Sequence, residues 1–148
     1  MVNLIRFIIN IKNNEVLFSL PIAGAGFLND AVALSASQAL LSDTGTGHIY
    51  KIEKNETNSL SYSIFIDASQ LNGNGVNGLF VNDSSLFLIT SSFGGDKKQG
   101  HLYRVELDSD YQLNGNIMRV SDDVIGNGNL DGIIWHNGLI FISDWESE

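Results

Sequence analysis

Cysteine is absent from this sequence, and proline occurs only once in 148 residues. Without cysteine the chain has no disulfide, no thiolate metal ligand and no cysteine nucleophile. Long apolar runs are absent too, and the runs present fall far short of the roughly 20 residues that a membrane-spanning helix needs. The polar residues 12–15 interrupt the apolar N-terminal stretch, so we expect no signal peptide, which slightly favours a cytoplasmic location.

Positive charge is also scarce. The chain has 8 basic side chains against 17 acidic ones, a formal net charge of −9. A surface of this sign repels phosphate backbones and anionic lipids, so we expect neither nucleic acid nor a membrane as a partner. Apolar residues make up 43% of the chain and charged residues 17%, a balance that can fill a core and predicts one folded domain over residues 1–148.

The apolar residues that are present occur in short β-branched or aromatic runs bounded by glycine and asparagine. Asn-Gly or Asp-Gly pairs stand beside several of these runs, a pattern typical of antiparallel strands joined by tight turns. The exception is residues 31–41, whose alanines and leucines favour a helix on intrinsic propensity alone.

Three segments of the chain resemble one another. They start with Phe-Leu-Asn-Asp at residues 27–30, Val-Asn-Gly-Leu at residues 76–79 and Leu-Asp-Gly-Ile at residues 130–133. Each continues into a second apolar run, and the sequence alignment places three residues at the same point of that run: Ser42, Thr90 and Ser143. The spacing of the copies is close to the length of a propeller repeat. By this similarity, residues 31–41 are predicted to form a pair of strands.

A second motif follows each of the first two copies. It is His-Ile-Tyr-Lys-Ile at residues 48–52 and His-Leu-Tyr-Arg-Val at residues 101–105, with a looser copy at residues 3–7. Each is predicted to be a strand with its basic residue on the more solvated face. Together with one further strand, each unit predicts a four-stranded antiparallel sheet, which repeated radially is a β-propeller blade.

The order of these motifs predicts an all-β fold with twelve strands. They are the third and fourth strands of one blade, two full blades, and the first and second strands of another. This is three blades' worth, or half of a six-bladed ring, and an open arc exposes unpaired strand edges. Two copies could close the ring as a homodimer, or the chain could be a fragment of a longer propeller protein, and the sequence leaves both alternatives open.

Asn29, Asn77 and Asp131 hold the same place in the three copies. In a propeller these residues are expected to converge at one mouth of the central channel. Carboxylate and amide oxygens of this kind suit a hard divalent cation such as calcium. The alternative is that they are ordinary turn residues, a common role for Asn and Asp.

The motifs around these three residues resemble, in order and spacing, the calcium-site motifs of the gluconolactonase/regucalcin (senescence marker protein) family of six-bladed β-propellers. They resemble those of paraoxonases more loosely. The resemblance spans nearly the whole chain but covers about half of a family member. It implies that Asn77 and Asp131 bind a divalent metal and that Asn29 contacts substrate or, as in paraoxonases, the metal. The family's further metal-binding Glu, in a Gly-Glu-Gly-Pro-like motif, has no counterpart here.

This resemblance implies calcium-dependent hydrolysis of a small lactone or ester, or the same reaction with another divalent cation. Asp131 is then a metal ligand and the candidate catalytic base, while Asn29 and Asp30 are candidate substrate-binding residues. The alternatives are a non-catalytic propeller that serves as a binding scaffold and an inactive fragment of a longer protein.

The histidines and tryptophans are predicted to lie outside this site. His48 and His101 occupy equivalent places in their strands and are expected to be structural, and His136 is expected to be solvated. Trp135 and Trp145 are expected to pack between blades.

Overall fold

The computed structural model describes residues 4–10, 12–71, 75–91, 100–120, 123, 125, 126 and 129–145. Over these residues the chain forms twelve strands and one 3-10 helix, η1 (Ala68–Leu71). The strands are β1 (Leu4–Asn10), β2 (Glu15–Ile22), β3 (Leu28–Ala33), β4 (Gln38–Asp43), β5 (Ile49–Lys54), β6 (Leu60–Ile66), β7 (Gly75–Asn82), β8 (Ser85–Ser91), β9 (Leu102–Leu107), β10 (Leu113–Arg119), β11 (Leu130–His136) and β12 (Leu139–Asp144). None of the described residues belongs to a helix with the length and apolar character that crossing a bilayer requires.

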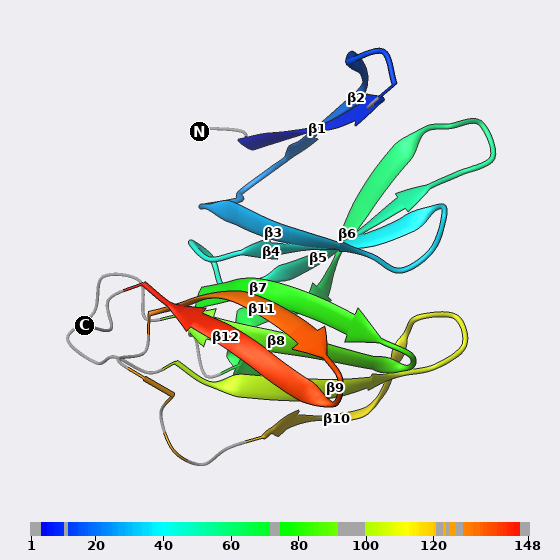
Figure 1. Cartoon of the computed structure of the whole chain (residues 1–148). Coiled ribbons are helices and arrows are strands. Elements are labelled where there is room, and N and C mark those ends of the chain that lie inside the picture. The colour runs from blue at the N-terminus through cyan, green and yellow to red at the C-terminus, as the bar shows by residue number, and fades with distance from the viewer. Residues whose placement is uncertain are drawn as a thin grey trace.

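The strands form four separate antiparallel sheets, shown in Figure 1. Sheets β3-β4-β5-β6 and β7-β8-β9-β10 have four strands each, and sheets β1-β2 and β11-β12 have two each. The all-β fold with four-stranded antiparallel sheets is therefore confirmed. All twelve strands predicted from the sequence are present.

Residues 31–41 form strands in spite of their helix-favouring composition. Ala31, Val32 and Ala33 of β3 pair with residues of β4 across a turn in which the Leu34 N–H donates to the Gln38 oxygen (2.9 Å). Leu40 and Leu41 then point to opposite faces of the sheet, and both are buried. Burial on two faces outweighs the small intrinsic preference for a helix, which is a few tenths of a kcal/mol per residue, roughly.

The first strands of the three repeats, β3, β7 and β11, carry a β-bulge at the same point. In each bulge, two residues of the first strand stand opposite one residue of the second: Asn29 and Asp30 opposite Ser42, Asn77 and Gly78 opposite Ile89, and Asp131 and Gly132 opposite Ser143. The sequence alignment that matched Thr90 with Ser42 was therefore wrong by one residue, because the turn between β3 and β4 is longer than that between β7 and β8.

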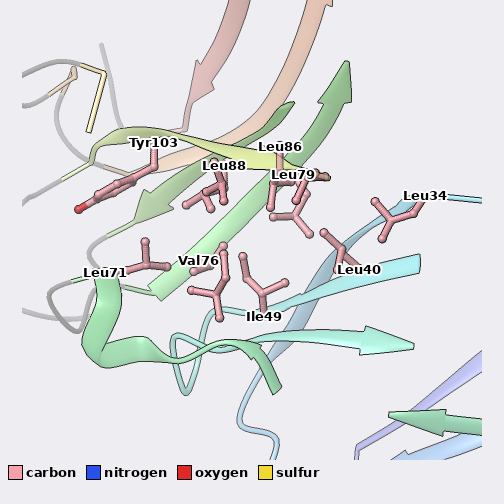
Figure 2. Close-up of a cluster of buried hydrophobic side chains, with 12 residues drawn as sticks. Leu34, Leu40, Ile49, Leu71, Val76, Leu79, Leu86, Leu88 and Tyr103 are labelled. Atoms are coloured by element: carbon pink, nitrogen blue, oxygen red, sulfur yellow. The ribbon is translucent and has the colours of Figure 1, made fainter. Parts of the chain in front are cut away.

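Neighbouring sheets pack face to face, with a layer of apolar side chains between each pair. The largest layer lies between the two four-stranded sheets, where Leu40 and Ile49 of one sheet lie against Val76 and Leu79 of the other (Figure 2). Ile22 of β2 joins the layer with the β3–β6 sheet, and Leu130 of β11 joins the layer with the β7–β10 sheet.

Lys51 and Arg104 hold the same repeat position but have different surroundings. The prediction of a solvated basic residue holds for Arg104, which is exposed, and is wrong for Lys51, which is 3% exposed. The Lys51 Nζ lies over the Phe65 ring (5.8 Å from its centroid) and donates to the Tyr111 backbone oxygen (3.1 Å). Tyr111 lies in the turn between β9 and β10 of the next sheet, and the lysine is buried because this turn contacts it.

Strand β7 lies between the first strands of the neighbouring sheets and contacts both β3 and β11 (Figure 1). The approach to β11 is close at Gly78, where an added Cβ would lie 2.7 Å from the Asp131 backbone oxygen. Only glycine fits there without a shift of the backbone. The glycine of the Asn-Gly-Leu motif therefore sets the distance between two sheets and, with it, the distance between Asn77 and Asp131.

Candidate functional site

A pocket of about 330 Å³ opens where the first strands of three sheets meet. Seven residues line it: Phe27, Asn29, Thr44, Asn77, Ser91, Asp131 and Trp145. The three residues that the repeat singled out are thus brought together. They come from three different sheets and from positions far apart in the sequence.

The pocket is built from two repeat positions, each contributed by all three sheets. Asn29, Asn77 and Asp131 are the first residues of the three bulges. The residues at the second position are Thr44, Ser91 and Trp145. Each directly follows a residue that pairs with the first strand just before the bulge, namely Asp43, Thr90 and Asp144. Sequence reasoning missed this second set, although the shared strand ending before it was a usable signal.

The bulge explains why these side chains face the pocket. An extra residue in one strand bends it locally and redirects a side chain that regular alternation would place elsewhere. In two of the bulges a serine on the opposite strand satisfies the N–H of the second bulge residue: Ser42 Oγ accepts from Asp30 (2.9 Å) and Ser143 Oγ from Gly132 (2.8 Å). The bulge is therefore a defined and repeated local structure.

Asn29 is held by a chain of hydrogen bonds that crosses between sheets. Its Nδ2 donates to Thr44 Oγ1 (3.1 Å), and that hydroxyl donates to the Val76 backbone oxygen (2.8 Å), which is buried. Because the hydroxyl hydrogen is used on Val76, Thr44 Oγ1 acts as an acceptor toward Asn29, and this fixes which side of the amide points at Thr44.

Asn77 and Asp131 line the pocket, and in the described part of the chain their side chains have no protein partner. Asn77 is 6% exposed, and neither side chain makes a hydrogen bond or ion pair with any residue in the described part of the chain. The polar atoms of both side chains are therefore available to water or a ligand in the pocket. These two residues are therefore the natural points of contact for a bound ion or molecule.

The donor atoms of the pocket are all oxygens of the kind that hard divalent cations prefer. They fit calcium in type, with one carboxylate, two amides and two hydroxyls. Their total charge is small, because Asp131 is the only carboxylate among the described lining residues. The described residues also contain no cluster of three or more His, Cys, Asp or Glu side chains that could hold a metal. Among the described residues that line the pocket, Asp131 is the one that could give a cation a charged ligand.

The rim of the pocket is aromatic. Phe27 and Trp145 are 50% and 63% exposed, so the expectation that Trp145 packs between sheets is wrong. Trp145 directly follows the last residue of β12 and lies at the pocket. Trp135, by contrast, stacks on Phe87 of the neighbouring sheet, with 6.4 Å between ring centroids, as expected for packing.

Asp43 holds the segment that carries Phe27. Its carboxylate accepts from the backbone N–H groups of Phe27 (2.6 Å), Gly26 (2.8 Å), Gly45 (3.0 Å) and Thr46 (3.3 Å). Burial alone would raise the pKa of Asp43, but the hydrogen bonds from Phe27, Gly26 and Thr46 outweigh it and lower the pKa below its ordinary value of 3.8. The carboxylate is thus a structural anion for this side of the pocket.

Asp30 does not line the pocket. Its Oδ2 accepts from the Leu79 N–H (2.8 Å) on the next sheet and its Oδ1 from the Ala31 N–H (2.8 Å). In this bulge the two side chains diverge, since Asn29 lines the pocket while Asp30 reaches the backbone of the next sheet. We assign Asp30 to the contact between β3 and β7 and leave it out of the site.

The histidines also lie outside the pocket. His48 Nδ1 accepts from the Ala68 N–H (3.1 Å), which fixes the start of η1, and His136 is exposed. His101 is 5% exposed, and its Nδ1 has no partner. Burial, followed by the charge of Arg119, lowers the pKa of His101 below 6.5 against the opposing effect of the Asp123 backbone.

No protein-family model and no curated protein sequence matches this chain.

Proposed function

We propose that the chain is half of a six-bladed β-propeller whose pocket binds a divalent cation, calcium in the first instance, and hydrolyses a small lactone or ester. Face-to-face packing of four-stranded antiparallel sheets, with β3, β7 and β11 as neighbouring first strands, supports the propeller arrangement. The motif resemblance to the gluconolactonase/regucalcin family supports the reaction class.

One observation carries this proposal. The first bulge residues of three successive sheets line one pocket, and two of them, Asn77 and Asp131, have no partner in the described part of the chain. Turn residues chosen only for their backbone preference would have no reason to converge on one cavity.

The residues divide the chemistry among them. Asp131 and Asn77 would hold the cation, and Asn29, oriented by Thr44, would face the substrate. When bound, a divalent cation polarises an ester carbonyl and stabilises the oxyanion that develops on it. A carboxylate bound to a dication would be a weak base, so we assign Asp131 the task of orienting the attacking water, whose proton would pass to solvent while the leaving alkoxide takes up a proton from solvent. Phe27 and Trp145 offer an apolar wall to the substrate.

Cation binding is tested by titrating calcium into the Trp135→Phe protein, in which Trp145 is the remaining tryptophan. Saturable binding by calorimetry, with a matching change in Trp145 emission, is expected. Asp131→Asn and Asn77→Ala should each abolish it. Asp83→Asn, which removes a carboxylate from the turn at the other end of β7, is the matched control and should bind as the parent does.

Hydrolysis is tested on a panel of small lactones and aryl esters, with and without calcium. Turnover that requires calcium and is lost in Asp131→Ala is the expected result. Absence of binding at millimolar calcium, together with lactone turnover unaffected by Asp131→Ala, would overturn the proposal.

A second candidate function is a non-catalytic binding scaffold. It is favoured by one observation: among the described residues that line the pocket, Asp131 is the only ionisable group. Calcium binding without turnover of any lactone or ester would select this candidate over the hydrolase.

A further inference from the structure

In the described part of the chain, two strands, β1 and β12, lack a partner on the side where the equivalent strands of the four-stranded sheets have one. In the four-stranded sheets the second strands, β4 and β8, pair on both sides, with the third strands β5 and β9 as their outer partners. In the two-stranded sheets, β12 pairs only with β11, and β1 pairs only with β2. By repeat position β12 is a second strand and β1 a third strand. In the described part of the chain, β12 therefore lacks a third strand as its outer partner, and β1 lacks a second strand as its inner partner.

The sheet β11-β12 also has an uncovered apolar face. Phe141 holds the repeat position of Leu40, which is fully buried between the two four-stranded sheets, yet Phe141 is 51% exposed. Ile134 likewise holds the position of Val32, which packs in that layer, and is itself exposed. Exposed apolar side chains at positions that are buried elsewhere in the same repeat mark a surface that lacks its covering sheet.

In the four-stranded sheet β3-β4-β5-β6, strands β3 and β4 carry small residues at positions where β7 and β8 of the next sheet carry large ones. Ala33 and Ala39 hold the positions of Val81 and Leu86, which pack against the preceding sheet. The alanines border a hollow of about 240 Å³ beside β2, and Leu17 and Phe18 form its other wall. The lining also includes polar residues such as Gln38 and Lys54, and the small side chains of Ala33 and Ala39 leave room there for the larger isoleucine and phenylalanine of the other face.

From these features we propose that two copies of this chain associate through a continuous intermolecular sheet, β12 of one copy pairing with β1 of the other. The faces that carry Phe141 and Ile134 then pack against the alanine face of the partner's β3-β4 sheet. Under two-fold symmetry the contact occurs twice, and β1 and β12 of both copies gain a partner.

The repeat predicts the register of this pairing. Gln38 pairs with Glu53 in one complete sheet, and Ser85 pairs with Glu106 in the other. In the two-stranded sheets, Leu139 of β12 holds the position of Gln38 and Ser85, and Ile8 of β1 holds the position of Glu53 and Glu106. Leu139 of one copy is therefore opposite Ile8 of the partner, and antiparallel pairing continues from there along both strands.

Association would also change the pocket. A ring made of two copies would place a second Asp131 beside the same central channel and so add a carboxylate to the one that the described lining residues of a single copy provide. The inference rests on the propeller arrangement in the proposed function but not on cation binding, so its tests are carried out in EDTA.

The register is tested by cysteine cross-linking, for which the absence of native cysteine makes the chain suitable. Directly opposite residues in an antiparallel pair lie within disulfide range, whereas diagonal neighbours lie at roughly 7–8 Å, beyond it. The double variant Leu139→Cys with Ile8→Cys should form a disulfide-linked dimer under mild oxidation. Its matched control, Leu139→Cys with Arg6→Cys, places the second cysteine two residues away on the same face and should remain uncross-linked.

The interface is tested without cysteine by light scattering. The parent chain should have twice the 16.2 kDa mass of one copy. Phe141→Asp should shift it to the monomer with an unchanged circular dichroism spectrum, because Phe141 is already half exposed in one copy. Met118→Asp, a similarly exposed apolar position on β10 outside the interface, should remain a dimer. A parent chain that stays monomeric in EDTA and in calcium, or equal cross-linking of both cysteine pairs, would overturn the inference and leave the calcium proposal standing.

Discussion

The backbone oxygen of Asp131 lies 2.7 Å from the point that a Cβ on Gly78 would occupy. This close approach between β7 and β11 fixes the distance between two neighbouring sheets. It also places the side chains of Asn77 and Asp131, the residues on the N-terminal side of the two bulge glycines, at one pocket. The glycine of the motif is therefore a structural requirement of the site.

The first prediction follows from this contact. Gly78→Ala should lower the free energy of unfolding by about 1–3 kcal/mol, because the new methyl group meets backbone that cannot move without shifting a sheet. Gly132→Ala is the matched comparison, since its Cβ would meet only the Ser143 Oγ at 3.2 Å, and it should cost less. Urea unfolding of both variants measures the difference, and equal losses would contradict the argument.

The second prediction concerns the two basic residues of the repeat. Lys51→Ala removes a buried hydrogen bond and the packing of the lysine stem, and should destabilise the protein by about 2 kcal/mol. Arg104→Ala removes a partly exposed ion pair with Glu106 and should change stability by less than about 1 kcal/mol. Thermal and urea unfolding test this order, which a larger loss in Arg104→Ala would refute.

The third prediction is a pH dependence that originates at Asp43. Its pKa is lower in the folded state than the ordinary value of 3.8, so the ionised form stabilises the fold above that value. This contribution is lost as the pH falls through the folded pKa, because the folded protein must then be protonated. Asp43→Asn should be less stable at pH 7 by about 2 kcal/mol and should lose less stability on acidification. Unfolding curves between pH 7 and pH 2 provide the measurement, and parallel losses in parent and variant would show that Asp43 is not responsible.

The fourth prediction places a second pH effect at His101. Because its pKa is lowered in the folded state, the unfolded chain takes up the proton first as the pH falls below 6.5. Stability is therefore greatest above pH 6.5 and decreases as the pH falls through the folded pKa of His101. His101→Phe should flatten this part of the profile, and His136→Phe, at an exposed position, should not. The melting temperature from pH 7.5 to pH 5 is the readout, and a slope that persists in His101→Phe would contradict the assignment.

The sequence allowed the strands and three of the residues that line the pocket to be predicted, because both depend on local pattern. Short apolar runs separated by glycine and asparagine specify strands and turns. In residues 31–41, similarity to the other two copies correctly predicted strands, whereas local propensity favoured a helix. The same repetition selected Asn29, Asn77 and Asp131, since equivalent positions in similar sheets adopt similar conformations. The propeller arrangement, the cation and the reaction remain predictions.

The tertiary structure decided what repetition alone cannot show. Lys51 and Arg104 share a motif, but only Lys51 has Tyr111 of a following sheet above it, so one is buried and the other is solvated. Asp30 differs from Asn29 by one position, and the bulge turns one side chain to the pocket and the other to Leu79. Local sequence determines the conformation of a repeat, whereas the contacts of a side chain depend on which sheet is its neighbour, and that is settled only when the sheets pack together.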